Sequence, residues 1–440
     1  MKRIKLKSAV VACMALLMVA VLIGGCAPRA VAPPEEELPT IKIGSATPLT
    51  GPHGAAGTYE MWVGWMNFWK WTNEVEGGLE AGGKKYKIDY SRWIDSKGDI
   101  PLCTAHYKRC AAAGCVAFQA RSTHEVAACL PLAERYRMPT FGDVSDLCFV
   151  DPPGGLGFGC TPAYLEGLIG GLQWFKEEIW KGDLPIRLGM ILWDTGMGRS
   201  LDHPEILGYL SGMGFELVDK EYVPYKVVDF TPTVVAMKKY DLDLIWWQGI
   251  VCGGLARDAA RLGMVPPNPY FISGDNGAAI MGQWAISEGA LETWYFLYHL
   301  YLCEEEDGVI PAVTKFLDIL EKYTGKRKTT VAPIVFDTAA YIYGHSNALM
   351  TAECLKRAIE AEGYPLTPDM VTRAAESLSD WDWGLTPFKV SLANNDNWGS
   401  HGWFIGQHLG GGKRIYVSEW RETSEETMRA FPRWFPHMAK

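Results

Sequence analysis

The sequence is poor in several features that mark common classes of protein. After residue 25 it has no apolar run near the roughly 20 residues that a membrane-spanning helix needs. No two of its 11 cysteines have the Cys-x-x-Cys spacing on which zinc sites and thioredoxin-like redox sites depend. Positive charge is also scarce, since the chain has 42 Lys and Arg but 51 Asp and Glu. The net charge of −9 argues against nucleic acid as a partner.

Motifs for the common catalytic mechanisms are missing as well. There is no Gly-x-Ser-x-Gly nucleophile elbow, no P-loop, and no Gly-x-Gly-x-x-Gly after a predicted strand. His124-Glu125 lacks the second histidine of a metalloprotease helix. We therefore expect a protein that is not an enzyme and that holds neither a metal ion nor a cofactor.

The first 26 residues have the layout of an export signal. Four basic residues precede an apolar run over residues 9–23, and Gly24-Gly25-Cys26 follows that run. The small-small-Cys ending resembles the bacterial lipobox, in which the cysteine becomes lipid-modified. An ordinary signal peptide or a membrane anchor with a chance cysteine is the alternative. We expect a signal peptide over 1–25, lipid on Cys26, and a Pro- and Glu-rich tether over 26–39.

The remaining 400 or so residues are too many for one typical core, so two lobes are expected. Without the four charges of the signal peptide the formal charge falls from −9 to −13. Nine cysteines remain after Cys13 and Cys26, and an odd number in an exported protein leaves at least one free. Cys148 and Cys160 flank a turn-rich loop and are a possible disulfide. The alternative is that most of the nine are small buried apolar residues.

Short apolar segments alternate with segments of helical period along the chain, in two successive cycles. Such alternation predicts parallel sheets with helices on both faces. The expected strands are 41–46, 86–90, 115–119, 138–141, 187–192, 215–222, 242–247, 270–272, 388–392, 403–409 and 415–417. The expected helices are 59–72, 101–113, 125–136, 164–179, 204–213, 232–239, 255–262, 311–323, 334–350 and 368–378.

Several of these strands end in polar or glycine-containing loops. In open parallel sheets, ligands bind beyond the carboxyl ends of the strands, near helix N-termini. If two sheets face each other across a cleft, these loops meet there. The loops are 50–54, 121–123, 142–146 and 273–276.

Several segments, in this order and spacing, resemble the leucine/isoleucine/valine-binding proteins. The resemblance extends from residue 41 to about residue 417. The segments that carry it are Ile41-Lys42-Ile43-Gly44 with Pro48-Leu49-Thr50-Gly51-Pro52, Asn73 to Gly77-Gly78, Asp95, Met138-Pro139-Thr140-Phe141, Asp194 to Gly198, Asp229-Phe230-Thr231, and Asp241-Leu242-Asp243-Leu244-Ile245.

This resemblance implies the type I periplasmic binding protein fold: two doubly wound parallel-sheet lobes joined by a hinge of three crossings. We expect the crossings near 158–161, 291–298 and 383–388. Lobe 1 would be 40–160 plus 294–384, and lobe 2 would be 161–293 plus 385–440. The implied function is capture of an amino acid or related small organic ligand by lobe closure, for an ABC permease. The protein would be a periplasmic or cell-surface monomer held to the membrane by lipid. A sensor that feeds a signalling partner is the alternative.

The resemblance also implies ligand-binding positions. Hydroxyls and loop residues of lobe 1 would hold a ligand carboxylate, and Asp275 would face a ligand ammonium. The positions implied or favoured are Ser122, Thr123, Ser145, Asp146, Tyr164, Met197, Trp247, Gln248 and Asp275.

Each of these positions has a plainer interpretation. Ser122 and Thr123 could simply begin a helix, and Asp275 could form an Asx turn. Asp146 is an acid where the family commonly has threonine, which would repel a carboxylate or attract a cation. Met197 replaces an aromatic lid, and Ala56 replaces a tyrosine. With 18 Trp in the chain, aromatic walls would suit an apolar or aromatic ligand.

Overall fold

Apolar strands buried on both faces form the first sheet. The computed structural model describes residues 37–50, 58–150, 155–225, 227–274, 281–330, 336–410, 413–435 and 438. The sheet has the order β2-β3-β1-β4-β5-β6 and is parallel except between β2 and β3. Every residue of β4 and β5 is buried, as expected for parallel strands covered by helices on both sides. The strands are β1 (Thr40–Thr47), β2 (Leu79–Ala81), β3 (Lys84–Asp95), β4 (Ala117–Ala120), β5 (Thr140–Gly142) and β6 (Gly157–Phe158).

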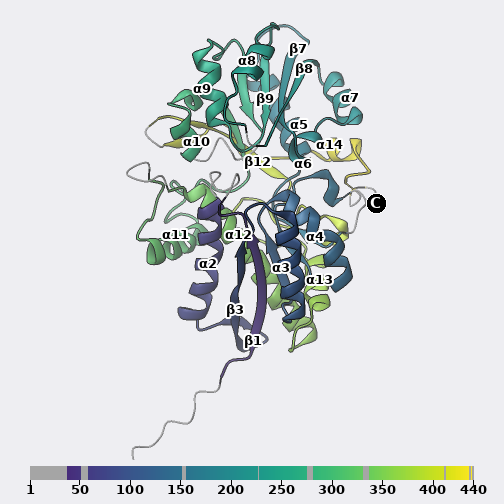
Figure 1. Ribbon diagram of the computed structural model, residues 1–440, viewed down its shortest axis with the longest axis vertical. Coiled ribbons are helices and arrows are strands. Elements are labelled where there is room, and N and C mark those ends of the chain that lie inside the picture. Colours follow the sequence, from purple (N-terminus) through teal and green to yellow (C-terminus); the bar gives the residue numbers. More distant parts are fainter. Residues whose placement is uncertain are drawn as a thin grey trace, which may run out of the picture. The chain divides into compact units, whose positions relative to one another are not determined.

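Helices flank this sheet on both sides, with α2 and α3 on opposite sides of β1 and β3 (Figure 1). The long helix α12 packs against α2 and α13, and α3 packs against α4. The contact between α2 and α12 is so close that a Cβ at Gly344 would clash with the carbonyl of Met61. The helices are α2 (Thr58–Glu74), α3 (Ile100–Ala112), α4 (Thr123–Tyr136), α11 (Pro311–Thr324), α12 (Thr338–Glu362) and α13 (Pro368–Glu376).

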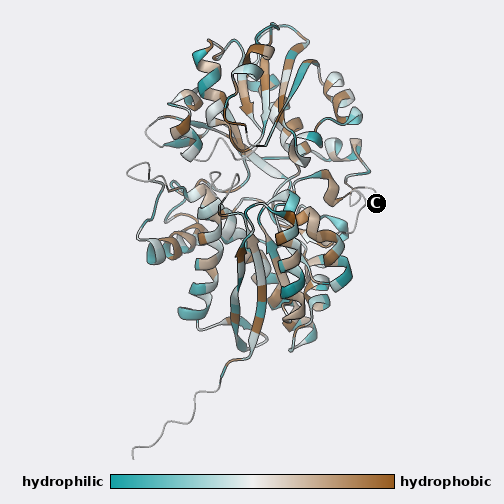
Figure 2. Ribbon diagram, viewed as in Figure 1, coloured by the Kyte–Doolittle hydropathy of each residue, from teal (hydrophilic) through white to brown (hydrophobic). Residues whose placement is uncertain are grey.

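The second sheet runs β13-β12-β11-β10-β9-β7-β8, with β14 paired to β12. Strands β7 to β11 are parallel, and β12 runs antiparallel to β11 and β13. Hydrophobic colour marks stretches of the strands, and the helices carry both hydrophobic and hydrophilic residues (Figure 2). The strands are β7 (Ile186–Trp193), β8 (Phe215–Val223), β9 (Leu244–Gln248), β10 (Tyr270–Ser273), β11 (Tyr295–Tyr298), β12 (Gly402–His408), β13 (Arg414–Tyr416) and β14 (Arg421–Glu422).

In the part of the chain that the structure describes, seven α-helices accompany the second sheet, and α5 continues into a π-helical turn, Phe175–Ile179. They are α5 (Tyr164–Trp174), α6 (Gly196–Arg199), α7 (Pro204–Gly212), α8 (Thr231–Met237), α9 (Gly253–Arg261), α10 (Met281–Ile286) and α14 (Glu425–Ala430). The predicted fold class is confirmed, because the described residues from Pro39 onward form two parallel-dominated sheets with helices. The signal peptide 1–25, Cys26 and most of the tether lie outside the described residues.

Two of the predicted lobe boundaries are wrong. Residues 295–298 form β11 within the second sheet, so the chain returns to the first lobe after Tyr298 and not at residue 294. Later, Asn397 donates hydrogen bonds to the carbonyls of Gly155 and Gly157, both at 2.6 Å. The chain therefore stays with the first lobe beyond residue 385 and crosses just before β12.

Two predicted elements also differ. Residues 388–392 form no strand, because only Val390 pairs, in an isolated bridge with Trp381. The helix expected over 334–350 begins at Thr338 and extends to Glu362. Asp337 sets that start by accepting hydrogen bonds from the backbone N–H groups of Ala339 and Ala340 at 2.7 and 3.3 Å.

Candidate functional site

A cavity of about 260 Å³ lies where the loops after β4 and β5 meet the loops after β7, β8 and β9. These loops leave the carboxyl ends of parallel strands, which is where open α/β sheets bind ligands. Both sheets therefore contribute a wall. The lining residues are Thr58, Arg121, Ser122, Thr123, His124, Ala127, Asp143, Asp146, Cys148, Trp193, Thr195, Gly196, Met197, Tyr225 and Ile250.

The wall from the first sheet is polar and charged. Arg121, directly after β4, lies 3.7 Å from the carboxylate of Asp143, which follows β5. The guanidinium also lies over the ring of Tyr343 on α12, 5.6 Å from its centroid. Burial raises the pKa of Asp143, and the charge of Arg121 opposes that shift. Arg121 and Asp143 thus form a buried ion pair in this wall.

Asp146 is the second carboxylate of the same wall. Its Oδ1 accepts the backbone N–H of Cys148 at 3.1 Å, which caps the short turn Leu147–Phe149. Burial raises the pKa of Asp146, and the nearby charge of Asp143 adds to the shift. A Cβ at Gly196 would clash with Asp146 Oδ2, so this carboxylate reaches the opposite wall.

The wall from the second sheet is mainly apolar and aromatic. Trp193 is the last residue of β7, and its ring lies 4.7 Å from that of Tyr225, in a tilted pair. Tyr225 also meets His124 of the first wall edge to face at 6.2 Å. Met197 and Ile250 complete this side. The cavity therefore combines aromatic surface on one side with charge on the other.

Three polar atoms of the lining residues have no hydrogen-bond partner among the described residues. They are Ser122 Oγ, Thr195 Oγ1 and Trp193 Nε1. Buried polar atoms are normally satisfied by protein, water or ligand. These three atoms are buried within the walls of the cavity.

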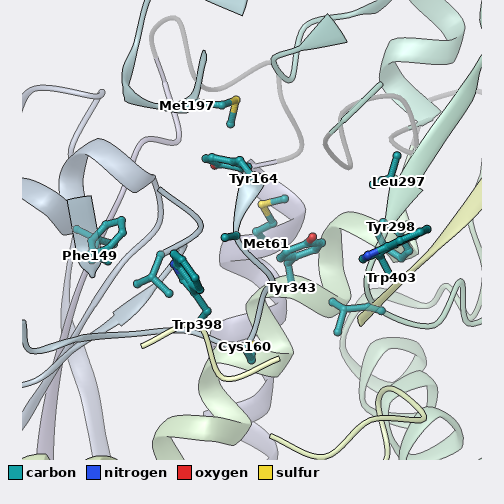
Figure 3. Close-up of a cluster of buried hydrophobic side chains, with 14 of the residues drawn as sticks. Met61, Phe149, Cys160, Tyr164, Met197, Leu297, Tyr298, Tyr343, Trp398 and Trp403 are labelled. Atoms are coloured by element: carbon teal, nitrogen blue, oxygen red, sulfur yellow. The ribbon is translucent and has the colours of Figure 1, made fainter. Parts of the chain in front are cut away.

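Four of the predicted ligand-binding residues line the cavity: Ser122, Thr123, Asp146 and Met197. Ser145 and Tyr164 instead line a separate cavity of about 20 Å³. The hydroxyls of Thr123 and Tyr164 lie 3.0 Å apart, which connects the two cavities through one hydrogen bond. Met197 and Tyr164 belong to the buried cluster shown in Figure 3.

Trp247 and Gln248 do not line the cavity, contrary to prediction. Both are fully buried in β9, because helices cover both faces of that strand. The Trp247 ring packs against Trp193 and Phe230, at 6.3 and 5.7 Å, so it supports the aromatic wall from behind. Gln248 accepts the indole N–H of Trp246 at 3.1 Å. Asp275 lies outside the described residues.

The possible disulfide between Cys148 and Cys160 is not formed. Cys148 is exposed and lines the cavity, whereas Cys160 is buried with its sulfur 3.8 Å from the hydroxyl of Ser346 on α12. The turn Leu147–Phe149 and β6 direct the two thiols to different surroundings. The turn-rich loop between the two cysteines was expected to bring them together, but in the structure they do not form a disulfide.

Eleven lining residues were not among the predicted ligand-binding positions, and five of these carry a charge or an aromatic ring: Arg121, Asp143, His124, Trp193 and Tyr225. Arg121 and Asp143 lie in the two loops that the sequence pattern pointed to, so their charge was the available signal. Trp193 directly follows a predicted strand. Tyr225 carried no sequence signal, because its place depends on how β8 leaves the second sheet.

None of the helices in the part of the chain that the structure describes is long and apolar enough to cross a membrane. Within the same residues, no three His, Cys, Asp or Glu side chains gather in a way that would hold a metal ion.

Comparison with known proteins places the chain in a family. The model of the family described as periplasmic binding protein matches residues 40–413. Curated protein sequences give no match. Similar solved structures include a branched chain amino acid ABC transporter protein from Thermus thermophilus with bound valine, with a TM-score of 0.74 and 18% identity, covering 88% of this chain and 97% of that one.

Two further structures share the fold. A fatty acid ABC transporter substrate-binding protein from Thermomonospora curvata has a TM-score of 0.71 and 19% identity, covering 88% of this chain and 93% of that one. A leucine binding protein from Thermotoga maritima has a TM-score of 0.67 and 14% identity, covering 87% and 99%. Since the family model spans most of the chain and the two-sheet architecture agrees with it, this protein belongs to the periplasmic binding protein family.

Proposed function

We propose that the protein captures a small organic ligand, an amino acid or a related compound with an apolar or aromatic part, and delivers it to an ABC permease. The observation that carries this proposal is the cavity whose walls come from both sheets. A ligand that touches both walls gains its full set of contacts only when the lobes are close together. Ligand binding therefore stabilises the closed arrangement over an open one.

The character of the walls supports a ligand that is partly apolar. Trp193, Tyr225, Met197 and Ile250 offer stacking and apolar contact, while the opposite side offers hydrogen bonds and charge. The related proteins from Thermus thermophilus and Thermomonospora curvata are described as binding valine and as serving fatty acid transport, both apolar in part.

A first test is ligand-dependent melting of the purified protein with a broad panel of amino acids, amides, amines and organic acids. A ligand present at 100 times its Kd should add about 2.7 kcal/mol to the free energy of unfolding. Replacing Tyr225 by alanine removes half of the aromatic pair and should raise the Kd of that ligand at least tenfold, or about 1.4 kcal/mol. Titration calorimetry measures the change.

Tyr240→Ala is the matched control, since Tyr240 is exposed and does not line the cavity. It should leave the Kd unchanged. A panel without any melting shift would contradict the proposed function, and equal Kd values for the two variants would remove Tyr225 from the site.

The site of action is the second part of the proposal. Export through the signal peptide 1–25 and lipid on Cys26 would hold the protein at the membrane surface, beside its permease. Cells grown with labelled fatty acid should label the wild-type protein in the membrane fraction. Cys26→Ser should be unlabelled, because serine lacks the thiol that is acylated. Labelling of the serine variant would show that Cys26 is not the anchor.

A further inference from the structure

The charges of the described residues that line the cavity do not balance. Among the described residues that line it, Arg121 is the cation, and Asp143 and Asp146 are the carboxylates. Arg121 forms an ion pair with Asp143, and its guanidinium lies over the ring of Tyr343. Its positive charge is therefore compensated within the first wall. Burial lowers the pKa of His124, which keeps its imidazole neutral near pH 7. Asp146 is left without a cationic partner among the described residues that line the cavity.

Asp146 lines the cavity, where a ligand could contact its carboxylate. One of its oxygens is occupied by the N–H of Cys148, and the other faces Gly196 in the opposite wall. The side chain is buried, with a relative exposure of 6%. A buried carboxylate without a cation is unfavourable, and a positive charge supplied by a ligand would offset that cost.

The opposite wall also favours a positive charge on the ligand. Trp193 and Tyr225 line the cavity, and aromatic rings attract cations through their electron-rich faces. The aromatic side chains of this wall and the carboxylate of Asp146 thus both favour a ligand with a positive charge.

We propose that the ligand is an organic cation: an aromatic or branched aliphatic body that carries a protonated amine and no free carboxylate. This inference rests on the proposed function, because it assumes that the cavity is the ligand site. A ligand carboxylate is disfavoured since it would face Asp146, while Arg121 is engaged with Asp143.

Compounds that share one body and differ only in the head group test the inference. The first set is 2-phenylethylamine, phenylacetamide, phenylacetate and phenylalanine, and the second is isoamylamine, isovaleramide, isovalerate and leucine. At pH 7 their heads are cationic, neutral, anionic and zwitterionic. Titration calorimetry on the purified protein should give the amine of at least one set a Kd at least tenfold below that of every other member.

Asp146→Asn should raise the Kd of that amine at least tenfold and bring it level with the amide. Asparagine keeps the oxygen that caps the turn Leu147–Phe149, so the fold is retained. The matched control is Glu80→Gln, which removes one negative charge from an exposed position on the edge strand β2. It should leave both Kd values unchanged.

The outcomes separate the two proposals. Tighter binding of an amino acid, a carboxylate or an amide than of the amine overturns the inference and leaves the proposed function standing. Equal loss of amine binding in Asp146→Asn and Glu80→Gln also overturns it. If none of the eight compounds binds, the inference falls, and the proposed function falls with it only when the wider panel gives no melting shift either.

Discussion

Arg414→Met is expected to lower the free energy of unfolding by about 3–5 kcal/mol, the usual cost of removing one partner from a buried ion pair. Arg414 belongs to β13 of the second sheet, and its side chain is only 1% exposed. Its guanidinium donates to Asp337 and to Glu304, both at 2.9 Å. Asp337 caps α12, which packs in the first lobe. The substitution would remove the guanidinium that pairs with both carboxylates between the two lobes.

The pKa of Arg414 agrees with this arrangement. Burial acts to lower it, but the charges of Asp337 and Glu304 outweigh burial and hold the pKa above its ordinary value. Arg414 is therefore charged at every pH at which the protein is folded, and the loss should not depend on pH near neutrality.

Urea denaturation followed by circular dichroism measures the effect of Arg414→Met. Two controls isolate the cause. Arg429→Met removes an exposed partner of Glu425 and should cost less than about 1 kcal/mol. Adding Asp337→Asn and Glu304→Gln to Arg414→Met should restore much of the loss, because no unpaired charge remains and asparagine still caps α12. A triple variant less stable than Arg414→Met would contradict this account.

His401→Gln is expected to destabilise the protein by about 3 kcal/mol at pH 6, and by less as the pH rises. The His401 ring lies between two buried carboxylates, with Nδ1 2.8 Å from Glu166 and Nε2 2.8 Å from Asp396. Glu166 is in the first turn of α5, and Asp396 lies just before the third crossing. This ion cluster thus joins the lobes at the crossing.

The direction of the pH dependence follows from the pKa of His401. Burial acts to lower that pKa, but Asp396 and Glu166 outweigh burial and hold it well above the ordinary value. Because the pKa in the unfolded chain is about 6.5, the stabilisation is complete below pH 6.5 and is lost as the pH rises through the folded-state pKa. Each unit by which the pKa is raised corresponds to about 1.4 kcal/mol.

The free energies of unfolding of the wild type and His401→Gln should be compared at intervals from pH 5.5 to 10. Their difference at each pH is the contribution of His401 to stability. The difference should be greatest at the acidic end. Asp396→Asn, which keeps an oxygen for the N–H groups of Trp398 and Gly399, should lower the pKa of His401 and move the loss to lower pH. A difference that grows with rising pH, or one below about 1 kcal/mol at pH 6, would contradict the assignment.

Local sequence pattern was enough to predict the class of fold. Strands β1, β7 and β9 and helices α2, α4 and α9 lie within a few residues of their predicted positions, because periodicity shows which residues must be buried. The predicted family is confirmed, and so is the expectation of a binding protein rather than an enzyme, since the family is one of binding proteins. The polar loops after β4 and β5, with Ser122, Thr123 and Asp146, were also found from their place after apolar strands.

The sequence by itself therefore determined two parallel-dominated sheets and the loops that gather at the carboxyl ends of their strands. Only the tertiary structure decided which residues meet: Trp193 with Tyr225, Asp146 with Gly196, His401 with Glu166, and Arg414 with Asp337. The last two pairs join residues 235 and 77 positions apart. Periodicity reports the burial of each segment, but such contacts depend on how one lobe packs against the other, which no local pattern encodes.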